Sequence, residues 1–382
     1  MPVKVLIICS LDEFANGVKP AELSQYLRAK GCEVEVYSAS YLSRIGKKGL
    51  AGVLPKPRPW HLALYLAEGI AAVAGKLGKL LPGSSPTLTK WSFMKPIMRL
   101  RGAVLRANFR HSGYDMIICE HNWDVAFVEG PRLARIQLLD LPSPFAEEVY
   151  FGGHISRRNY LALRDYEVQA YAKADGIGFH WHTYSDYVKK EKYDGPNFID
   201  LSYGVDLPVK RASYSPEPRV AFLGWLGDYW VNLPLLVRLC KIYPHIDIYG
   251  GPRLAELGEN YKGYAPTTDV LADYQLGLVT LREDPLRRHG FSSKQLRYYS
   301  YGLPALLPGW HHDSALDEAA LLYDEENFLR LVSECSDRQK WTELSDRALG
   351  IAQRYEWKNV LRSLDPFLAP AQPGAPAARV LP

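Results

Sequence analysis

A short basic stretch of the sequence has the residue types needed to bind a phosphate group. Residues 281–309 read LREDPLRRHGFSSKQLRYYSYGLPALLPG, and the apolar run at 276–280 before them predicts a buried parallel strand. Positively charged side chains in the loop after such a strand can pair with phosphate oxygens. The basic residues of this loop are Arg282, Arg287, Arg288 and His289.

The same stretch also predicts the start of a helix. Ser292 or Ser293 can cap a helix from about Lys294 to Tyr301, and Gly302 ends it. A helix N-terminus presents free backbone N–H groups and a partial positive charge, which favour a bound anion. With the lysine and the arginine-rich loop, this helix start predicts a diphosphate site. A solvated basic loop beside an ordinary helix would fit the same residues equally well.

Residues 292–304, SSKQLRYYSYGLP, resemble the donor-site helix of GT-B glycosyltransferases, whose usual form is S-x-K-x-x-E-Y-x-x-x-G-x-P. The stretch is also similar to the membrane-associated glucuronosyltransferases of xanthan synthesis, which have a similar serine pair, lysine, tyrosine and GLPA sequence. The resemblance implies that these residues bind a nucleotide-sugar donor, most simply a UDP-sugar. The donor-binding residues that it implies here are Ser292, Ser293, Lys294, Arg287 and Arg288.

One position departs from the pattern of these relatives. Many of them have a glutamate three residues after the lysine, where it commonly binds the ribose of the nucleotide, and this sequence has Arg297. An arginine cannot accept hydrogen bonds from ribose hydroxyls. We therefore place Arg297 among the donor-site residues and expect ribose recognition to be weak or to use another residue.

Two loops after predicted strands, and one further loop, complete the donor site that the resemblance implies. The strand at 220–223 leads to Gly227, and the strand at 246–249 leads to Gly250 in a glycine turn. Tyr264 lies in the loop expected beside the nucleobase. In open α/β sheets, ligands bind at the carboxyl ends of the strands, where the loops of Gly227 and Gly250 begin.

Glycosyl transfer requires that the departing diphosphate be stabilised and that the acceptor hydroxyl lose its proton. The sequence has no D-x-D, the usual metal–diphosphate motif. Lys294, Arg287 and Arg288 are therefore expected to take the place of a metal ion. No metal and no cofactor is predicted, and the nucleotide sugar is a substrate.

The group that accepts the proton is expected in the first half of the chain. Predicted strands at 116–119 and 136–139 are each followed by a polar cluster, which should lie at one edge of a parallel sheet. Asp140 is the first candidate for the base, since an inverting relative carries an aspartate in the corresponding loop. The other candidates are Glu120, His121 and Asp124. Asp140 could instead cap a turn, and His121 could be a hydrogen-bonded structural histidine.

The predicted fold class is α/β, with two Rossmann-like doubly wound domains facing a central cleft in the GT-B arrangement. The chain begins with a strand at 4–9, a helix at 20–30 and a strand at 33–37, which is typical of a doubly wound domain. The 382-residue chain is long enough for two domains. The predicted parts are an acceptor-binding domain (1–205), a nucleotide-sugar-binding domain (206–350), a helix crossing back (351–366) and a flexible tail (367–382).

The charge of the first domain is unevenly distributed. Residues 41–110 contain thirteen basic residues and one acid, a net charge of +12, so the rest of this +4 chain carries −8. Apolar residues recur at helical spacing within 61–81, which predicts a basic amphipathic helix, and a second basic helix is predicted at 96–109. Such an insertion suits an anionic membrane surface, although its apolar face could instead pack on the domain core.

Taken together, the sequence predicts an inverting, metal-independent glycosyltransferase. Its acceptor would be a hydroxyl of a membrane-associated glycolipid or polysaccharide precursor. The five unpaired-looking cysteines and the absence of a signal peptide predict a cytoplasmic protein, peripheral on the inner face of the membrane. Two alternatives remain open: a glycosyltransferase acting on nucleic acid, whose phosphates the basic segment would follow, and a sugar-nucleotide epimerase of the same fold.

Overall fold

The structure is a computed structural model. It describes residues 2–9, 18–38, 94–120, 122–226, 230–251 and 253–368. These residues form two compact units, of which the first ends at Ser202 and resumes at Leu361, while the second runs from Tyr203 to Val360. The sequence placed the first boundary after residue 205 and the return at 351. In the structure, residues 351–360 belong to the second unit.

The first unit is built on a parallel sheet with strand order β2-β1-β3-β4-β5. The runs KVLIIC and MIIC form two of its central strands because they are apolar on both sides, as buried parallel strands require. The strands are β1 (Lys4–Cys9), β2 (Glu33–Ser38), β3 (Met116–Cys119), β4 (Ile136–Leu141) and β5 (Gly176–Phe179).

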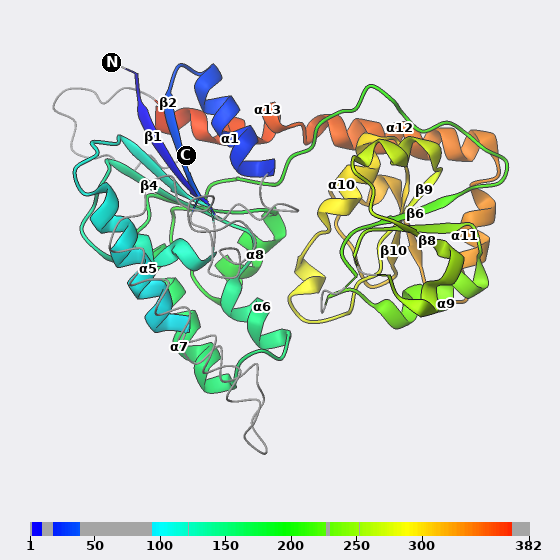
Figure 1. Ribbon diagram of the computed structural model, residues 1–382, viewed down its shortest axis with the longest axis horizontal. Coiled ribbons are helices and arrows are strands. Elements are labelled where there is room, and N and C mark those ends of the chain that lie inside the picture. The colour runs from blue at the N-terminus through cyan, green and yellow to red at the C-terminus, as the bar shows by residue number, and fades with distance from the viewer. Residues whose placement is uncertain are drawn as a thin grey trace. The chain divides into compact units, whose positions relative to one another are not determined.

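Helices cover both faces of this sheet. Figure 1 shows α5 and α7 on one side of the strands and α1, with the C-terminal segment of the chain, on the other. Asp365 of that segment accepts hydrogen bonds from Tyr26 Oη (2.6 Å) and Lys30 Nζ (2.8 Å), which fastens it to α1. The helices are α1 (Val18–Ala29), α5 (Met94–Phe109), α6 (Phe145–Phe151), α7 (Arg157–Tyr171) and α8 (His182–Glu191), with 3₁₀ helices η1 (Asn122–Glu129) and η6 (Leu361–Leu368).

The second predicted basic helix is present as α5. Met98, Leu105 and Phe109 are buried, and Arg106 Nη1 donates to the carbonyl of Ala126 at 2.6 Å, so this helix packs on its own unit. The remainder of the basic insertion, residues 41–93, lies outside the described residues. In the part of the chain that the structure describes, no helix has both the length and the apolar content needed to cross a bilayer.

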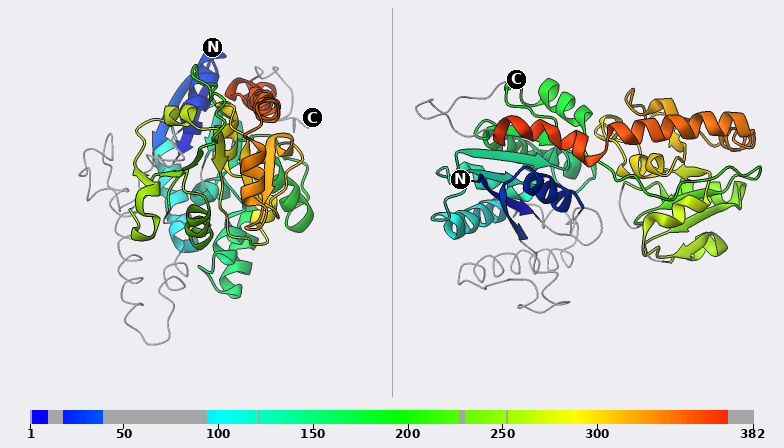
Figure 2. Two further views of the ribbon diagram at one scale, coloured as in Figure 1. Left: turned by 90° about the vertical axis from the view of Figure 1, so that its right-hand side faces the viewer. Right: turned by 90° about the horizontal axis from the view of Figure 1, so that it is seen from above.

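The second unit has a parallel sheet with strand order β11-β10-β9-β6-β7-β8. Its strands lie between α12 on one side and α9 on the other (Figures 1 and 2). The strands are β6 (Val220–Leu223), β7 (Ile246–Tyr249), β8 (Tyr261–Gly263), β9 (Leu276–Leu278), β10 (Ala305–Pro308) and β11 (Ala320–Tyr323). The helices are α9 (Leu233–Ile242), α10 (Ser293–Ser300), α11 (Phe328–Glu334), α12 (Arg338–Arg354) and α13 (Trp357–Val360), with 3₁₀ helices η2 (Ala255–Asn260), η3 (Thr268–Asp273), η4 (Arg287–His289) and η5 (Asp317–Ala319).

Two elements that the sequence predicts in the first unit are shorter in the structure. After residue 124 the sequence predicts a helix through Ala134, but the structure has η1, which ends at Glu129 before a Gly-Pro pair. The sequence also predicts a strand at 198–201, which makes only a bridge between Phe198 and Ile177. It predicts a loop at 151–154, of which Phe151 is instead the last residue of α6 and Gly152 and Gly153 form the turn after it.

A substitution at Gly178 tests how tightly β5 is packed. A Cβ atom at Gly178 would lie 2.5 Å from Leu201 Cβ, so Gly178→Ala should lower the free energy of unfolding by about 1–3 kcal/mol through overpacking. Gly350→Ala in α12 is the control, since its Cβ would meet nothing within 4 Å and a helical alanine should stabilise by about 0.5–1 kcal/mol. Urea unfolding measures both, and equal stability of Gly178→Ala and wild type would contradict this packing.

Candidate functional site

The register of the first sheet gathers polar side chains at its carboxyl edge. Glu120 follows directly after β3 and comes beside Asp140 of β4, which in turn is paired with Gly178 of β5. Paired residues of neighbouring strands point to the same face, and so does His180, two residues beyond Gly178. Asp140 lies within β4 rather than after it, because the strand extends to Leu141 where the sequence predicted an end at 139.

A lysine from the covering helix completes this group. Lys19, near the start of α1, donates to Asp140 Oδ1 at 2.7 Å and to the carbonyl oxygen of Leu201 at 2.5 Å. Both charged side chains are fully buried. A buried carboxylate that is paired and hydrogen-bonded is far less costly than an isolated one. Lys19 therefore makes an ionised Asp140 possible in the interior.

The four side chains Lys19, Glu120, Asp140 and His180 form what we call the acid–base cluster. His180 Nε2 lies 3.7 Å from Asp140 Oδ1 and 3.9 Å from Glu120 Oε1. The side chain of His180 is 10% exposed, whereas those of Glu120 and Asp140 are 1% and 0% exposed. All three residues are therefore buried, and His180 keeps the largest exposed fraction of them.

The charges of the cluster bear on whether it could hold a metal ion. Burial raises the pKa of Asp140, and the charge and hydrogen bond of Lys19 oppose that shift. Glu120, Asp140 and His180 have ligand types and spacing that could hold a metal ion. However, the Lys19 ammonium already places a positive charge at 2.7 Å from Asp140, which disfavours a second cation in the same space.

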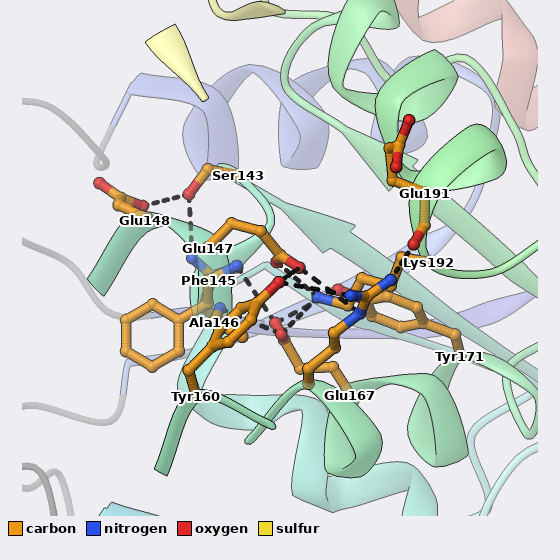
Figure 3. A network of polar contacts seen from close by, with 12 residues as sticks. Ser143, Phe145, Ala146, Glu147, Glu148, Tyr160, Glu167, Tyr171, Glu191 and Lys192 are labelled. Atoms are coloured by element: carbon orange, nitrogen blue, oxygen red, sulfur yellow. Dashed lines mark hydrogen bonds and ion pairs between the residues drawn. The ribbon is translucent and has the colours of Figure 1, made fainter. Parts of the chain in front are cut away.

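A second buried network fixes the chain that follows Asp140 (Figure 3). Glu167 of α7 accepts hydrogen bonds from the backbone N–H groups of Phe145 (3.2 Å) and Ala146 (3.0 Å), at the start of α6. Lys192 Nζ bridges Glu167 (2.6 Å) and Glu147 (2.8 Å). Burial lowers the pKa of Lys192, but the two carboxylates outweigh it and hold that pKa above its ordinary value. The turn between β4 and α6 is therefore held by paired charges.

Of the residues predicted for proton transfer, the structure brings Asp140 and Glu120 together. His121 lies outside the described residues, as does the side chain of Asp124. Lys19 and His180 were not predicted from the sequence. His180 is the first polar residue after the apolar run at 176–179, so the rule that selected Glu120 would also have found it. Nothing marked Lys19, since a lysine at a helix start is normally exposed.

In the second unit, helix α10 is positioned by a buried tyrosine. Tyr298 Oη donates to the carbonyl of Leu278 on β9 and accepts from the backbone N–H of Leu223 on β6, both at 3.0 Å. The second turn of α10 is thereby held at the carboxyl ends of these two strands. Of the two serines predicted as caps, Ser292 is the N-cap residue. Its side chain makes no hydrogen bond to the first turn, so the expected hydroxyl cap is absent.

Lys294 lies against the turn that follows β6. A Cβ atom at Gly224 would be 2.3 Å from Lys294 Cε, and Lys294 Nζ stands 4.8 Å from the ring centre of Phe222. Gly250 approaches the same turn from β7, since its Cβ would be 2.8 Å from the carbonyl oxygen of Gly224. With φ angles of +152° at Gly224 and +100° at Gly250, both turns require glycine. Lys294, Gly224 and Gly250 thus meet at one place.

The two neighbouring arginines of the basic loop have different surroundings. The side chain of Arg287 is 14% exposed and lies over the ring of Trp230, 5.1 Å from its centre. The side chain of Arg288 is 62% exposed and pairs with Glu283. Asp284 Oδ1 accepts from the backbone N–H of Arg287 at 2.8 Å and shapes the turn. Arg287 is therefore the more enclosed of the two arginines.

The remaining predicted donor residues are less tightly defined by the structure. Ser293 is the exposed first residue of α10, and Arg297 is half-buried in its last turn. Tyr264 is 65% exposed after β8, as a side chain that could stack on a planar ligand would be. Gly227 lies outside the described residues. His311, which the sequence analysis did not select, is buried after β10, and burial lowers its pKa.

No family model matches the sequence, and no curated protein sequence matches it either. Solved structures do resemble the fold. Sucrose-phosphate synthase from Thermosynechococcus elongatus has a TM-score of 0.68 at 11% identity, over 95% of this chain and 98% of that one. Anabaena HepE, solved with UDP and glucose, has a TM-score of 0.58 at 13% identity, over 96% and 99%.

S. aureus TarM, solved with UDP and sugar ligands, has a TM-score of 0.54 at 13% identity and covers 70% of this chain. This chain spans 58% of the length of TarM. The calicheamicin glycosyltransferase CalG4 has a TM-score of 0.52 at 12% identity, over 96% and 99%. These likenesses confirm the predicted fold: two Rossmann-like α/β units of the GT-B type.

The buried ion pair predicts a stability defect that depends on pH. Lys19→Met should lower the free energy of unfolding by about 3–5 kcal/mol at pH 8, because it leaves the Asp140 carboxylate buried without its partner. Without the ammonium, burial raises the pKa of Asp140 further. A carboxyl group whose pKa is raised in the folded state stabilises that state at low pH, where the group is protonated, and this stabilisation is lost as the pH rises through the raised pKa. The loss of stability in Lys19→Met should therefore be smaller at pH 5 than at pH 8.

Lys30→Met is the matched control for this measurement. Lys30 makes a comparable 2.8 Å ion pair with Asp365 in the same unit, but both side chains are 41% exposed. Its loss should cost no more than about 1 kcal/mol. Denaturant unfolding measures the stability of both variants at pH 5 and pH 8. Equal losses of stability in Lys19→Met and Lys30→Met would contradict the role given to the buried ion pair.

Proposed function

We propose that the protein is a glycosyltransferase that moves a sugar from a nucleoside diphosphate donor, a UDP-sugar, to an acceptor hydroxyl. The position of Lys294 carries this proposal. Its side chain lies against Gly224 at the end of β6, at the start of α10, where a helix N-terminus favours an anion. The fold supports the same conclusion, since UDP is present in two of the related structures.

The donor diphosphate is held by positive side chains of the second unit. Lys294 supplies one charge, and Arg287, fixed over Trp230, supplies another that can form paired hydrogen bonds to phosphate. As the bond to the sugar breaks, negative charge grows on the diphosphate, and fixed positive groups stabilise it. Transfer then proceeds without a metal ion, and with inversion at the anomeric carbon. The acceptor proton passes to the acid–base cluster of the first unit.

The acceptor is a hydroxyl of a membrane-associated glycolipid or polysaccharide precursor, as in the glucuronosyltransferases of xanthan synthesis. The support is the +12 charge of residues 41–110 and the helical spacing of apolar residues within 61–81. The protein would then work on the cytoplasmic face of the membrane, bound peripherally. Nucleic acid has less support as a partner, because it would not require an apolar stripe.

Donor binding is tested by comparing the binding of UDP with that of uridine, which lacks the phosphates. Lys294→Ala should weaken UDP binding by about 1.5–3 kcal/mol, the range for hydrogen bonds to charged groups, and uridine binding much less. Arg287→Ala should act in the same direction, and more than Arg288→Ala, because Arg288 is exposed and pairs with Glu283. Lys241→Ala, an exposed lysine of α9, is the control. Isothermal titration calorimetry measures each affinity.

Equal losses for UDP and uridine would make Lys294 a structural residue. Transfer should also survive chelation with EDTA, whereas strict dependence on added Mg²⁺ or Mn²⁺ would contradict the proposed role of the positive side chains. Product analysis distinguishes a glycosyltransferase from the alternative, a sugar-nucleotide epimerase, which would interconvert nucleotide sugars without releasing UDP.

Membrane binding is tested with vesicles of defined charge. The protein should co-sediment with vesicles containing phosphatidylglycerol and much less with pure phosphatidylcholine, and high salt should reduce the bound fraction. The double variant Lys76→Glu, Lys79→Glu reverses two charges of the basic segment and should weaken binding without changing UDP affinity. Equally negligible binding to both kinds of vesicle would rule out the membrane proposal.

A further inference from the structure

One face of α10 leads from the predicted phosphate-binding lysine to a buried tyrosine. Lys294, Arg297 and Tyr301 follow one another at steps of three and four residues, so they lie on one face of the helix. Tyr301 is the C-cap residue of α10 and is 2% exposed. Burial raises the pKa of Tyr301, and the positive charge of Arg297 acts against this shift. Arg297 and Tyr301 are therefore neighbours on this face.

Tyr301 connects this face of α10 to a carboxylate of η3. Its hydroxyl donates to Asp269 Oδ1 at 3.1 Å and accepts from Thr268 Oγ1 at 2.8 Å. Asp269 Oδ2 accepts from Thr267 Oγ1 at 3.1 Å, and Thr267 is also the N-cap residue of η3. Asp269 itself is exposed. A carboxylate is therefore held at the surface beside α10 by contacts on both of its oxygens.

The carboxylate of Asp269 has hydrogen-bonding capacity that these contacts do not use. An ionised carboxylate can accept about four hydrogen bonds. Within the described residues, Asp269 accepts one from a side chain on each oxygen. Lys294 and Arg297, by contrast, can only donate. Of these three side chains, Asp269 is the one that can accept a hydrogen bond from a ligand hydroxyl.

We propose that Asp269 binds the ribose hydroxyls of the nucleotide donor and selects a ribonucleotide over a deoxyribonucleotide, with Tyr301 as its positioning residue. This inference rests on the proposed function, in which Lys294 binds the diphosphate, and it adds how the nucleoside is recognised. The two neighbouring hydroxyls of ribose are hydrogen-bond donors, and hydrogen bonds to an ionised acceptor are stronger than those to a neutral one.

The spacing along α10 suits a nucleoside diphosphate. Tyr301 follows Lys294 by seven residues, which is about 10 Å along the helix axis. Helical side chains point back toward the N-terminus, so the hydroxyl of Tyr301 lies over an earlier turn than its own Cα. Tyr264, five residues before Asp269 and 65% exposed, gives the same segment an aromatic ring for the base. Contacts to diphosphate, ribose and base can thus follow one another within the second unit.

A ribose contact is measurable as a preference between two nucleotides. 2′-Deoxy-UDP differs from UDP only in lacking the 2′-hydroxyl, so it can make the same phosphate contacts. A site that binds a substrate hydroxyl discriminates against the analogue that lacks it. A hydrogen bond to a charged group corresponds to a difference in affinity of about tenfold or more. The ratio of the two affinities therefore reports the ribose contact separately from the phosphate contacts.

The test measures the binding of UDP and 2′-deoxy-UDP by isothermal titration calorimetry. Asp273→Ala is the matched control, because Asp273 is an exposed carboxylate of the same 3₁₀ helix that pairs with Lys210 at 2.8 Å. We expect the wild type to bind UDP about tenfold or more tightly than 2′-deoxy-UDP, and Asp269→Ala to reduce this ratio below about twofold by weakening UDP alone. Tyr301→Phe should give an intermediate ratio, and Asp273→Ala the wild-type ratio.

A merely structural role of Asp269 would weaken both nucleotides equally and leave their ratio unchanged, and this result would overturn the assignment. Equal binding of the two nucleotides by the wild type would overturn it as well. If Asp269→Ala does not fold, Asp269→Asn decides the question, since it removes the charge of the acceptor and should lower the ratio. A wild-type protein that binds neither nucleotide would instead overturn the proposed function, so the two failures are distinguishable.

Discussion

The buried ion pair of Lys19 and Asp140 is the interaction on which the first unit depends. Two charges without water are tolerated only when their geometry is good and their other hydrogen bonds are made. Lys19 meets this condition by binding Asp140 at 2.7 Å and the carbonyl of Leu201 at 2.5 Å. One side chain thereby joins the start of α1, the end of β4 and the segment that follows β5. These elements hold their positions because the buried ammonium group of Lys19 would be costly without its partners.

In the second unit, neutral groups rather than charges position α10 and the turns beside it. Tyr298 connects α10 to β6 and β9 through one hydroxyl, and glycines allow the turns after β6 and β7 to approach each other closely. Lys294 and Arg287, the cations of the proposed donor site, are half-buried and make none of these connections. In the first unit, by contrast, the buried charges of Lys19 and Asp140 are part of the core.

The sequence was sufficient for the parts of the fold that local patterns determine. The runs at 4–9, 116–119 and 220–223 are strands because they are short, apolar and β-rich, as strands buried on both faces are. Helix α10 lies within a residue of its predicted bounds. The carboxyl-edge rule selected Asp140 and Glu120 correctly as neighbours. It could not show that Lys19 covers them, because that contact joins residues 121 positions apart and depends on how α1 packs.

The directions of side chains could not be predicted from the sequence either. Arg287 and Arg288 are identical in type and adjacent, yet one lies over Trp230 and the other pairs outward with Glu283. Ser292 occupies the N-cap position without using its hydroxyl, since a preference for a position does not fix a rotamer. Residues 198–201, although apolar enough for a strand, make a single bridge with β5.

The return of residues 361–368 to the first unit has a consequence for how this protein can be divided. The second unit is one continuous segment, residues 203–360, inserted into the first. A recombination event that exchanges this segment leaves the first unit complete, whereas a break after residue 202 removes Leu361, Leu364 and Phe367 from its buried residues. Evolution can thus replace the second unit as one continuous segment, whereas the first unit can be inherited only as two segments together.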